Sequence, residues 1–237
     1  LNDVNPQGMN RRISLSIITL TKNRAGLLEK CLYSLKDQLV PSDEIIIVNN
    51  NSSDDTQLVL HKFKQFLPVR EFNSKLSGYP NLYNFAISKS TKEVLLFLDD
   101  DCVATKNYIA EIRDRFKNKQ NFVLQGKTVS LPRNNIFSEI AERHLNNWVN
   151  ANIFEGNKMQ VIDNRNVAIP KKIIKKVGDF SSAMKVGSED IEFGMALKQK
   201  YPDYYISYRR DALVGRSGRR YLKYGIRLHW NGYPIAR

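Results

Sequence analysis

The fold is decided by the stretch EVLLFLDDDC, residues 93–102. Its first six residues are almost all apolar, which is typical of a strand that a parallel sheet buries on both faces. Three carboxylates follow at once, those of Asp99, Asp100 and Asp101. Like charges repel, and a buried carboxylate costs free energy unless something compensates it. The triplet is therefore either a solvated turn or one half of a site that a cation completes.

The chain before this stretch alternates between strand and helix patterns. Apolar runs and helical spacing predict strands over 13–20, 43–48 and 93–98, and helices over 21–39, 56–67 and 77–90. Ser52 or Ser53 is expected to cap the second helix. This alternation favours an α/β fold with a right-handed, mostly parallel central sheet flanked by helices.

The second half of the chain is less regular. Its patterns predict strands over 121–131, 165–170 and 203–208, and helices over 136–154 and 188–200. In the last helix Ser188 is the expected cap, and Ile191, Met195 and Leu197 are expected to face a core. The Gly-rich basic stretch 214–225 is expected to be mobile. Because we see no repeat and no obvious linker, we expect residues 1–237 to form one domain.

Polar segments follow three of the predicted strands. They are TKNR at 21–24, NNNSSDD at 49–55 and DDDC at 99–102. In open α/β sheets, ligands bind outside the carboxyl ends of the strands. The sequence therefore predicts a ligand site where these three segments meet.

The chain is strongly basic, with 37 Lys and Arg against 24 Asp and Glu and a formal net charge of +13. The excess gathers in KKIIKK at 171–176 and from Tyr208 onward, where eight Lys and Arg accompany one acid, Asp211. Solvated surface lysines explain part of it. The rest favours an anionic partner, which is a phosphorylated small molecule, an anionic membrane surface or a nucleic acid.

The setting of the protein is suggested by three further observations. No apolar run approaches the roughly 20 residues of a membrane-spanning helix. The first residues lack the apolar core of a signal peptide, and Cys31 and Cys102 form no repeated pattern. We therefore expect a cytoplasmic protein in a reducing setting.

Five motifs, in this order, resemble those of family-2 glycosyltransferases, which have the GT-A fold. They are SIITLTKNR at 16–24, EIIIVNNNSSDDT at 44–56, LLFLDDD at 95–101, NVAIPKKIIKKVGDF at 166–180 and GSEDIEFGMALKQKY at 187–201. A lone acidic motif would be weak support, but the ordered set covers most of the chain. The resemblance implies a Rossmann-like sheet with a nucleotide-sugar half at about 1–102 and an acceptor half at about 103–237.

The resemblance implies an inverting enzyme of the hexosyltransferase class. Such an enzyme moves one sugar from a nucleoside diphosphate sugar to an acceptor hydroxyl, in the synthesis of lipopolysaccharide, capsule or lipid-linked glycans. It implies a divalent cation, Mn²⁺ or Mg²⁺, with Asp101 as a direct ligand and His229 as a further ligand. Asp99 is a further candidate for the metal site and would contact the ribose or a metal-bound water, and Asp100 is expected to point away. The alternative for His229, which stands beside Trp230, is a purely structural role.

The nucleotide is expected to lie over the ends of the first two strands. The candidate contacts there are Thr19, Thr21, Arg24, Asn49 and Asn50. Asn stands at 49 and 50 where the family usually has Asp, but an Asn carbonyl also accepts the N3–H of uracil or thymine. UDP- or dTDP-sugars are therefore favoured, with GDP-sugars as the alternative.

Tyr83 is a second departure, because members of the family often carry Arg at this position. A cation that contacts the diphosphate is therefore expected from elsewhere. Arg216 and Arg219, in the basic C-terminal segment, are candidates because a guanidinium pairs well with phosphate oxygens.

Asp190 matches the position of the family's general base. The first turn of a helix favours its ionised form through the helix dipole, as a base requires. Glu189 and Asn166 are implied on the acceptor side, and the alternative is that the two acids only cap the helix. With a glycan or lipid-linked acceptor, the basic tail would also suit the anionic inner face of a membrane.

Two other classes of protein explain only part of the pattern. A sugar-nucleotide nucleotidyltransferase also uses metal-binding carboxylates, but the segment TLTKNRAG has a single glycine, Gly26, and no GxGxR loop. A basic nucleic-acid-binding module explains the charge. It leaves the acids at the ligand edge unexplained, because carboxylates repel phosphates unless a metal intervenes. We therefore expect no nucleic-acid partner.

Overall fold

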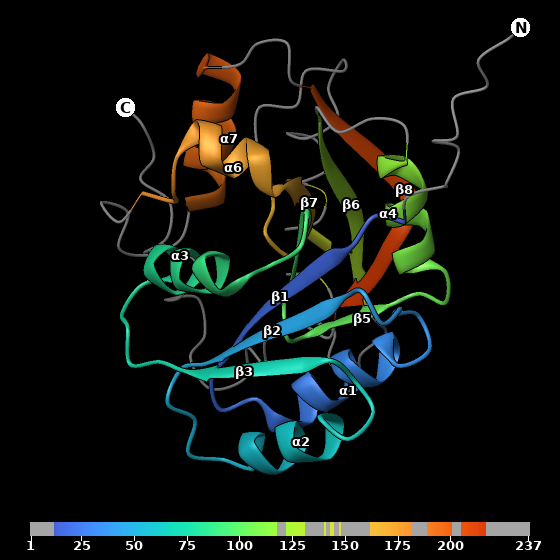
Figure 1. Cartoon of the computed structure of the whole chain (residues 1–237), viewed down its shortest axis with the longest axis vertical. Helices are drawn as coiled ribbons and strands as arrows, with labels where there is room; N and C mark the ends of the chain where they lie inside the picture. The colour runs from blue at the N-terminus through green and yellow to red at the C-terminus, as the bar shows by residue number, and fades with distance from the viewer. Residues whose placement is uncertain are drawn as a thin grey trace, which may run out of the picture.

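The computed structural model of the chain describes residues 12–117, 122–130, 140, 143–144, 147, 162–181, 189–200 and 205–216. They build one eight-stranded sheet in the order β3-β2-β1-β4-β7-β6-β8-β5 (Figure 1). The strands are β1 Leu15–Thr21, β2 Glu44–Asn49, β3 Val69–Asn73, β4 Val94–Leu98, β5 Cys102–Ala104, β6 Phe122–Ser130, β7 Asn166–Pro170 and β8 Tyr205–Arg216. The helices are α1 Ala25–Leu35, α2 Thr56–Phe63, α3 Tyr79–Lys89, α4 Tyr108–Phe116, α6 Lys171–Val177 and α7 Glu189–Lys200.

Strands β1 to β4 form the parallel half of the sheet. β1 lies between β2 and β4, and β3 pairs with the outer side of β2. In this register Thr21 at the end of β1 is opposite Asn49 at the end of β2. The polar segments that follow β1, β2 and β4 therefore leave the sheet at the same edge, as the sequence predicts.

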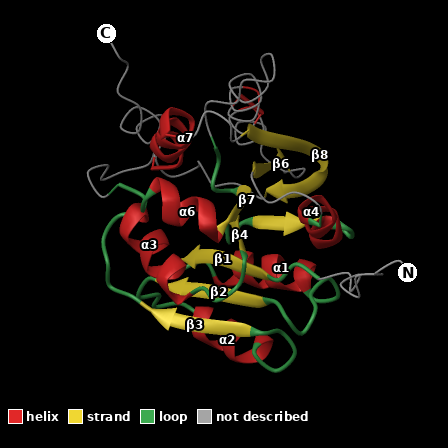
Figure 2. Cartoon of the chain, turned by 45° about the horizontal axis from the view of Figure 1, so that its top comes forward, coloured by secondary structure: helices red, strands yellow, loops and turns green. Residues whose placement is uncertain are grey.

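Alternate residues of the strands enter two separate cores, one on each face of the sheet. On one face the apolar side chains of α1, α2 and α4 pack against residues such as Ile17 and Ile47. On the other face those of α3, α6 and α7 pack against residues such as Ile18 and Val48, and Figure 2 shows α3 and α6 lying together. Since successive side chains of a strand point to opposite faces, covering both faces requires the near-continuous apolar runs seen in the sequence.

β7 continues the sheet from β4 in the antiparallel direction and leads to β6, β8 and β5. Gly126 of β6 lies against Asn166, the first residue of β7. A Cβ added to Gly126 would be 2.4 Å from the amide atoms of Asn166, closer than any real contact of this kind. Asn166 therefore occupies space that only a glycine leaves open.

The α/β fold with a mostly parallel sheet is confirmed, and the strands and helices expected within the described ranges are present with shifted ends. The sequence missed β3, β5, α4 and α6. β3 (VREFN) is an edge strand whose charged side chains hide the pattern, and β5 has only three residues. The basic run of α6 conceals an apolar face formed by Ile173, Ile174 and Val177. The single-domain organisation stays a prediction.

Three local expectations were wrong. Met195 is 57% exposed, because it lies on the opposite side of α7 from the buried Phe193 and Leu197. Helix α2 begins at Thr56, and the side chain of Asp54, rather than that of a serine, accepts the Thr56 N–H at 3.1 Å. Residues 214–216 belong to β8, so the stretch predicted to be mobile begins as a strand.

Some expectations fall on residues that the structure does not describe. They are the Ser188 cap, most of the helix expected over 136–154, and the part of the basic segment beyond residue 216. Within the described ranges, no helix is both long enough and apolar enough to cross a membrane.

Replacing Gly126 by Ala should lower the melting temperature, because the new Cβ would overlap the side chain of Asn166. Overpacking of this kind costs about 1–3 kcal/mol. Gly26→Ala is the matched control: a Cβ there meets nothing within 4 Å, and a helix gains up to about 1 kcal/mol from the exchange. Calorimetric melting of both variants checks the expectation, and equal melting temperatures would contradict it.

Candidate active site

The acidic triplet forms a tight turn between β4 and β5. The N–H of Cys102 donates to the carbonyl of Asp99 at 3.1 Å, which closes the turn. Asp99 is half-buried, whereas Asp100 and Asp101 are 2% and 1% exposed. The triplet is therefore not a solvated turn, and its charges need compensation from within the protein or from a ligand.

Asp100 is directed into the structure and does not point away as expected. Its Oδ1 accepts a hydrogen bond from Nη1 of Arg24 at 2.7 Å, and its Oδ2 accepts one from the hydroxyl of Thr21 at 2.9 Å. Burial raises the pKa of Asp100, and the charge and hydrogen bonds of Arg24 oppose that rise. The middle acid thus ties the end of β4 to the segment after β1.

The segments after β1 and β2 brace each other. Asn23 has a positive φ of 53°, its N–H donates to Ser52 Oγ at 3.0 Å, and its Oδ1 accepts the N–H of Ser53 at 2.7 Å. The N–H of Ala25 donates to Asp54 Oδ2 at 2.9 Å. These bonds hold the two predicted nucleotide-binding segments, 21–24 and 49–55, as one rigid edge.

The structure places the other predicted nucleotide contacts at this edge. Thr19 is buried within β1, and the buried Asn49 accepts the N–H of Ser52 at 3.1 Å through Oδ1. Asn50 is half-buried, and its N–H donates to the carbonyl of Thr21 at 2.9 Å. Of these three side chains Asn50 is therefore the most accessible to a ligand.

The two acids of α7 lie at its first turn. Asp190 Oδ1 accepts the N–H of Ile191 at 2.8 Å, and Oδ2 accepts the N–H of Asn164 at 3.3 Å. Glu189 is buried, and its Oε1 lies 3.5 Å from the Asn164 side-chain nitrogen. Burial, followed by the charges of Asp163 and Glu189, raises the pKa of Asp190 to about 7. Such a carboxyl is half ionised near neutral pH, which suits a general base.

The segment that contacts these acids, residues 162–166, is held by buried side chains. Gln125 of β6 accepts the N–H of Asp163 at 2.9 Å and donates to the carbonyl of Asn166 at 2.8 Å. Arg165 pairs with Asp163 through Nε and Nη2, with the Nε distances at 2.9 and 2.7 Å. Sequence reasoning missed these positioning residues. The signal that could have found them is the polar run DNRN directly before an apolar strand.

Asn166 itself is 1% exposed, and both polar atoms of its side chain are hydrogen-bonded. Its Oδ1 accepts the hydroxyl of Tyr108 at 2.7 Å, and its Nδ2 donates to the carbonyl of Lys127 at 3.0 Å. An acceptor-side influence of Asn166 would therefore act through the 162–166 segment. Direct contact with an acceptor stays a prediction that this burial does not favour.

An aromatic cluster links the two sets of acids. The ring of Phe180 lies 5.6 Å from that of Tyr83 on α3, 5.8 Å from that of Phe97 on β4 and 5.0 Å from that of Phe193 on α7. Burial raises the pKa of Tyr83 well above its usual value, and the charges of Asp99, Glu189 and Asp190 add to that rise. At the position where the sequence lacks the family's Arg, the charges of both acid sets therefore act on the buried Tyr83.

Asn84 fixes Phe180 in this cluster. Its Oδ1 accepts the N–H of Phe180 at 2.9 Å, and its Nδ2 donates to the carbonyl of the same residue at 2.8 Å. The side-chain amide of Asn84 thus makes the two hydrogen bonds that a neighbouring strand would otherwise make. It holds the segment after α6 against α3.

The remaining predicted residues are placed in part or not at all. The backbone of Arg216, at the end of β8, is opposite Cys102 in the β5–β8 pair, directly after the acidic triplet. Arg219 and His229 lie outside the described residues. Asp99 and Asp101 offer the carboxylate oxygens that Mg²⁺ and Mn²⁺ prefer. Within the described ranges no group of three potential metal ligands occurs, so ligands beyond these two carboxylates would have to come from elsewhere.

The model of the family described as Glycosyl transferase family 2 matches residues 16–178. The chain belongs to this family. A β-1,3-glucosyltransferase of Campylobacter jejuni that acts on GalNAc(5)-diNAcBac-PP-undecaprenol is 37% identical over 95 residues, which cover 37% of this chain and 29% of the relative. A poly(ribitol-phosphate) β-glucosyltransferase of Bacillus spizizenii is 29% identical over 122 residues, 48% of this chain and 19% of the relative. The chain spans between 16% and 29% of the length of these and two further curated relatives.

Solved structures confirm the GT-A fold of this family-2 chain. The mannosyltransferase PcManGT of Pyrobaculum calidifontis, in complex with GDP-Man and Mn²⁺, has a TM-score of 0.69 at 18% identity and covers 91% of this chain and 59% of its own. TarS of S. aureus has a TM-score of 0.68 at 18% identity and covers 86% of this chain and 37% of its own. At such identities the likeness concerns the fold.

The raised pKa of Asp190 predicts a pH-dependent stability. Because the folded-state pKa lies above the unfolded value, the group's contribution to stability is complete below about 4 and is lost as the pH rises through about 7. Asp190→Asn should therefore raise the melting temperature at pH 8.5 more than at pH 5.5, by about 2–4 °C for each kcal/mol recovered. Asp37→Asn, at an exposed acid, is the control, and equal shifts at both pH values would contradict the burial of Asp190.

Proposed function

We propose that this family-2 chain moves a single sugar, with inversion, from a nucleoside diphosphate sugar to a hydroxyl of a glycan or lipid-linked acceptor. The observation that carries the proposal is the aromatic cluster, which joins β4, the strand before the acidic triplet, to α7, the helix that carries Asp190. The carboxyl of Asp190 has a pKa of about 7. A donor site and a base are thereby held on one rigid support. The relatives that act on an undecaprenol-linked glycan and on poly(ribitol-phosphate) support a cell-surface glycan as the acceptor.

The donor is proposed to bind at the edge formed by the segments after β1, β2 and β4. The ribose would lie near Asp99 and the base near Asn49 and Asn50, whose segments are braced before the ligand arrives. UDP- or dTDP-sugars remain the favoured donors, with GDP-sugars as the alternative. Two similar structures support both classes, since TarS is in complex with UDP-GlcNAc and PcManGT with GDP-Man.

Asp99 and Asp101 are proposed to hold Mn²⁺ or Mg²⁺, with His229 as a further ligand. When bound, the ion stabilises the negative charge that develops on the leaving diphosphate. Mn²⁺ accompanies the nucleotide in the similar structures of PcManGT and GalNAc-T7. The two carboxylates would hold the ion that attracts the donor's phosphates, while β4 and the aromatic cluster keep the carboxylates in place.

Asp190 is proposed as the general base. The acceptor oxygen forms a bond to the anomeric carbon as the bond from that carbon to the diphosphate breaks. The acceptor proton passes to the carboxylate of Asp190, and the nucleoside diphosphate leaves with the bonding electrons. The N–H groups of Ile191 and Asn164 orient the carboxylate, and buried Glu189 borders the acceptor side.

Asp101→Ala should abolish metal-dependent transfer, because the cation would lose a direct ligand. We expect a loss of at least about 100-fold in kcat/KM, measured with a panel of sugar nucleotides and Mn²⁺ or Mg²⁺. Asp37→Ala removes an exposed acid far from the triplet in sequence and is the matched control. Full activity of the Asp101 variant with the best donor would overturn the metal assignment.

The pH profile tests the base. Because only the ionised carboxylate takes a proton, kcat/KM should rise with pH and level off above about 7, following the pKa of Asp190 in the free enzyme. Asp190→Asn should lose turnover by about 100-fold or more while keeping donor affinity within about 3-fold. An equal loss of turnover and donor affinity would count against the base role.

A further inference from the structure

We propose that Asp100 is a positioning residue that holds Arg24 as the cation for the donor's diphosphate. The inference rests on the proposed sugar transfer and assigns its phosphate contact within the described part of the chain. It gives a task to the one acid of the triplet that the metal site does not use.

The hydrogen bonds of Asp100 separate it from its neighbours in function. Its two oxygens are occupied by different partners, Nη1 of Arg24 at 2.7 Å and the hydroxyl of Thr21 at 2.9 Å. The side chain is 2% exposed, and both of its oxygens already accept hydrogen bonds from the chain itself. Because a buried carboxylate is costly unless it is paired, the charge of Asp100 holds the guanidinium of Arg24 in place beside it.

Arg24 is held at both of its ends. Its backbone carbonyl accepts the N–H groups of Leu27 and Leu28 at 3.0 Å, which fixes the residue at the start of α1. Its side chain reaches the triplet and is 30% exposed. A guanidinium has five N–H donors, and the hydrogen bond to Asp100 uses Nη1. Donors therefore remain for an anion that arrives from solvent.

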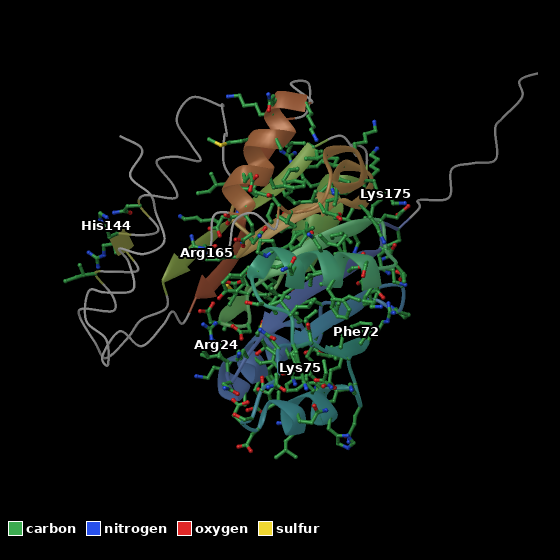
Figure 3. All side chains as sticks on the ribbon, turned by 90° about the vertical axis from the view of Figure 1, so that its left-hand side faces the viewer. Arg24, Phe72, Lys75, His144, Arg165 and Lys175 are labelled. Atoms are coloured by element: carbon green, nitrogen blue, oxygen red, sulfur yellow. The ribbon has the colours of Figure 1, made fainter. Side chains whose placement is uncertain are left out.

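The position of Arg24 suits a ligand that also meets the metal-binding acids. Its Nη1 lies 4.0 Å from Oδ2 of Asp101, the proposed direct metal ligand. A diphosphate that binds a cation at Asp101 would therefore come within reach of the same guanidinium. In Figure 3 Arg24 and Arg165 lie on the same flank of the molecule, but Arg165 is engaged by Asp163.

The helix that contributes Tyr83 supplies no competing cation. Along α3, from Tyr79 to Lys89, the basic residue is Lys89 in the last turn. Tyr83 itself is buried in the aromatic cluster. The charge that this chain lacks at position 83 is thus provided from the other side of the triplet, by the segment after β1.

The test measures binding in the full chain with Mn²⁺ present. Titration calorimetry would compare inorganic pyrophosphate, UDP, GDP and uridine as probes on the wild type, Arg24→Met, Asp100→Asn, the double variant and Lys22→Met. Lys22 is the matched control, because it is an exposed cation in the same segment. Melting temperatures of all variants confirm that they are folded.

We expect Arg24→Met and Asp100→Asn each to weaken pyrophosphate and the tighter-binding nucleoside diphosphate by about 10- to 100-fold, the range of a charged hydrogen bond. Uridine binding should change by less than about 2-fold. The double variant should bind no more weakly than Arg24→Met alone, because Asp100 acts through Arg24. Arg24→Lys should restore only part of the affinity, since an ammonium lacks the planar fork.

Three results would overturn the proposal. They are unchanged pyrophosphate binding in Arg24→Met, an equal loss in Lys22→Met, and additive losses in the double variant. A loss confined to UDP or uridine would assign Arg24 to the nucleotide base instead. If the wild type binds neither pyrophosphate nor nucleoside diphosphate with Mn²⁺, the proposed sugar transfer itself fails, and this outcome is distinct from the others.

Discussion

The packing of Phe180 against rings from three different elements is the contact on which the site depends. Its partners are Tyr83 of α3, Phe97 of β4 and Phe193 of α7. Two of these elements carry acids of the candidate site, because the triplet follows β4 and Asp190 stands in the first turn of α7. The two hydrogen bonds from Asn84 fix the backbone of Phe180 in place. Closely packed large rings have little freedom to move, so the acids after β4 and Asp190 are set relative to each other by apolar contact.

The two sets of buried acids have neighbours of opposite charge. In the triplet the guanidinium of Arg24 pairs with Asp100, so a cation of the chain compensates part of the charge before any ligand binds. Around Asp190 the nearby charges of Asp163 and Glu189 are negative, and burial with these charges raises the pKa of Asp190. The paired guanidinium opposes the rise in the pKa of Asp100, whereas the crowded Asp190 gains proton affinity. This difference fits the roles proposed for the two acids, which are positioning a phosphate contact and taking a proton from the acceptor.

The fold followed from local pattern where the pattern was strong. Strands buried on both faces were predicted, because only a strand covered on both sides needs a near-continuous apolar run. The shared edge of the polar segments was predicted as well, because parallel strands end on the same side of a sheet. Edge strand β3 and the helix α6 were missed, since charged residues mask their apolar sides. The roles of Asp163 and Gln125 were missed as well, because they arise from pairs 38 residues apart that no local window contains.

The sequence by itself determined the α/β class, the family and the acids that follow β4 and begin α7, since these depend on short-range periodicity and ordered motifs. Only the tertiary structure decided what the acids do to each other. It turned Asp100 inward to Arg24 across 76 residues of chain, and it buried Tyr83 where the charges of both Asp99 and Asp190 act on it. Electrostatic and packing energies depend on distance in space and on burial, and neither is encoded at any single position of the chain.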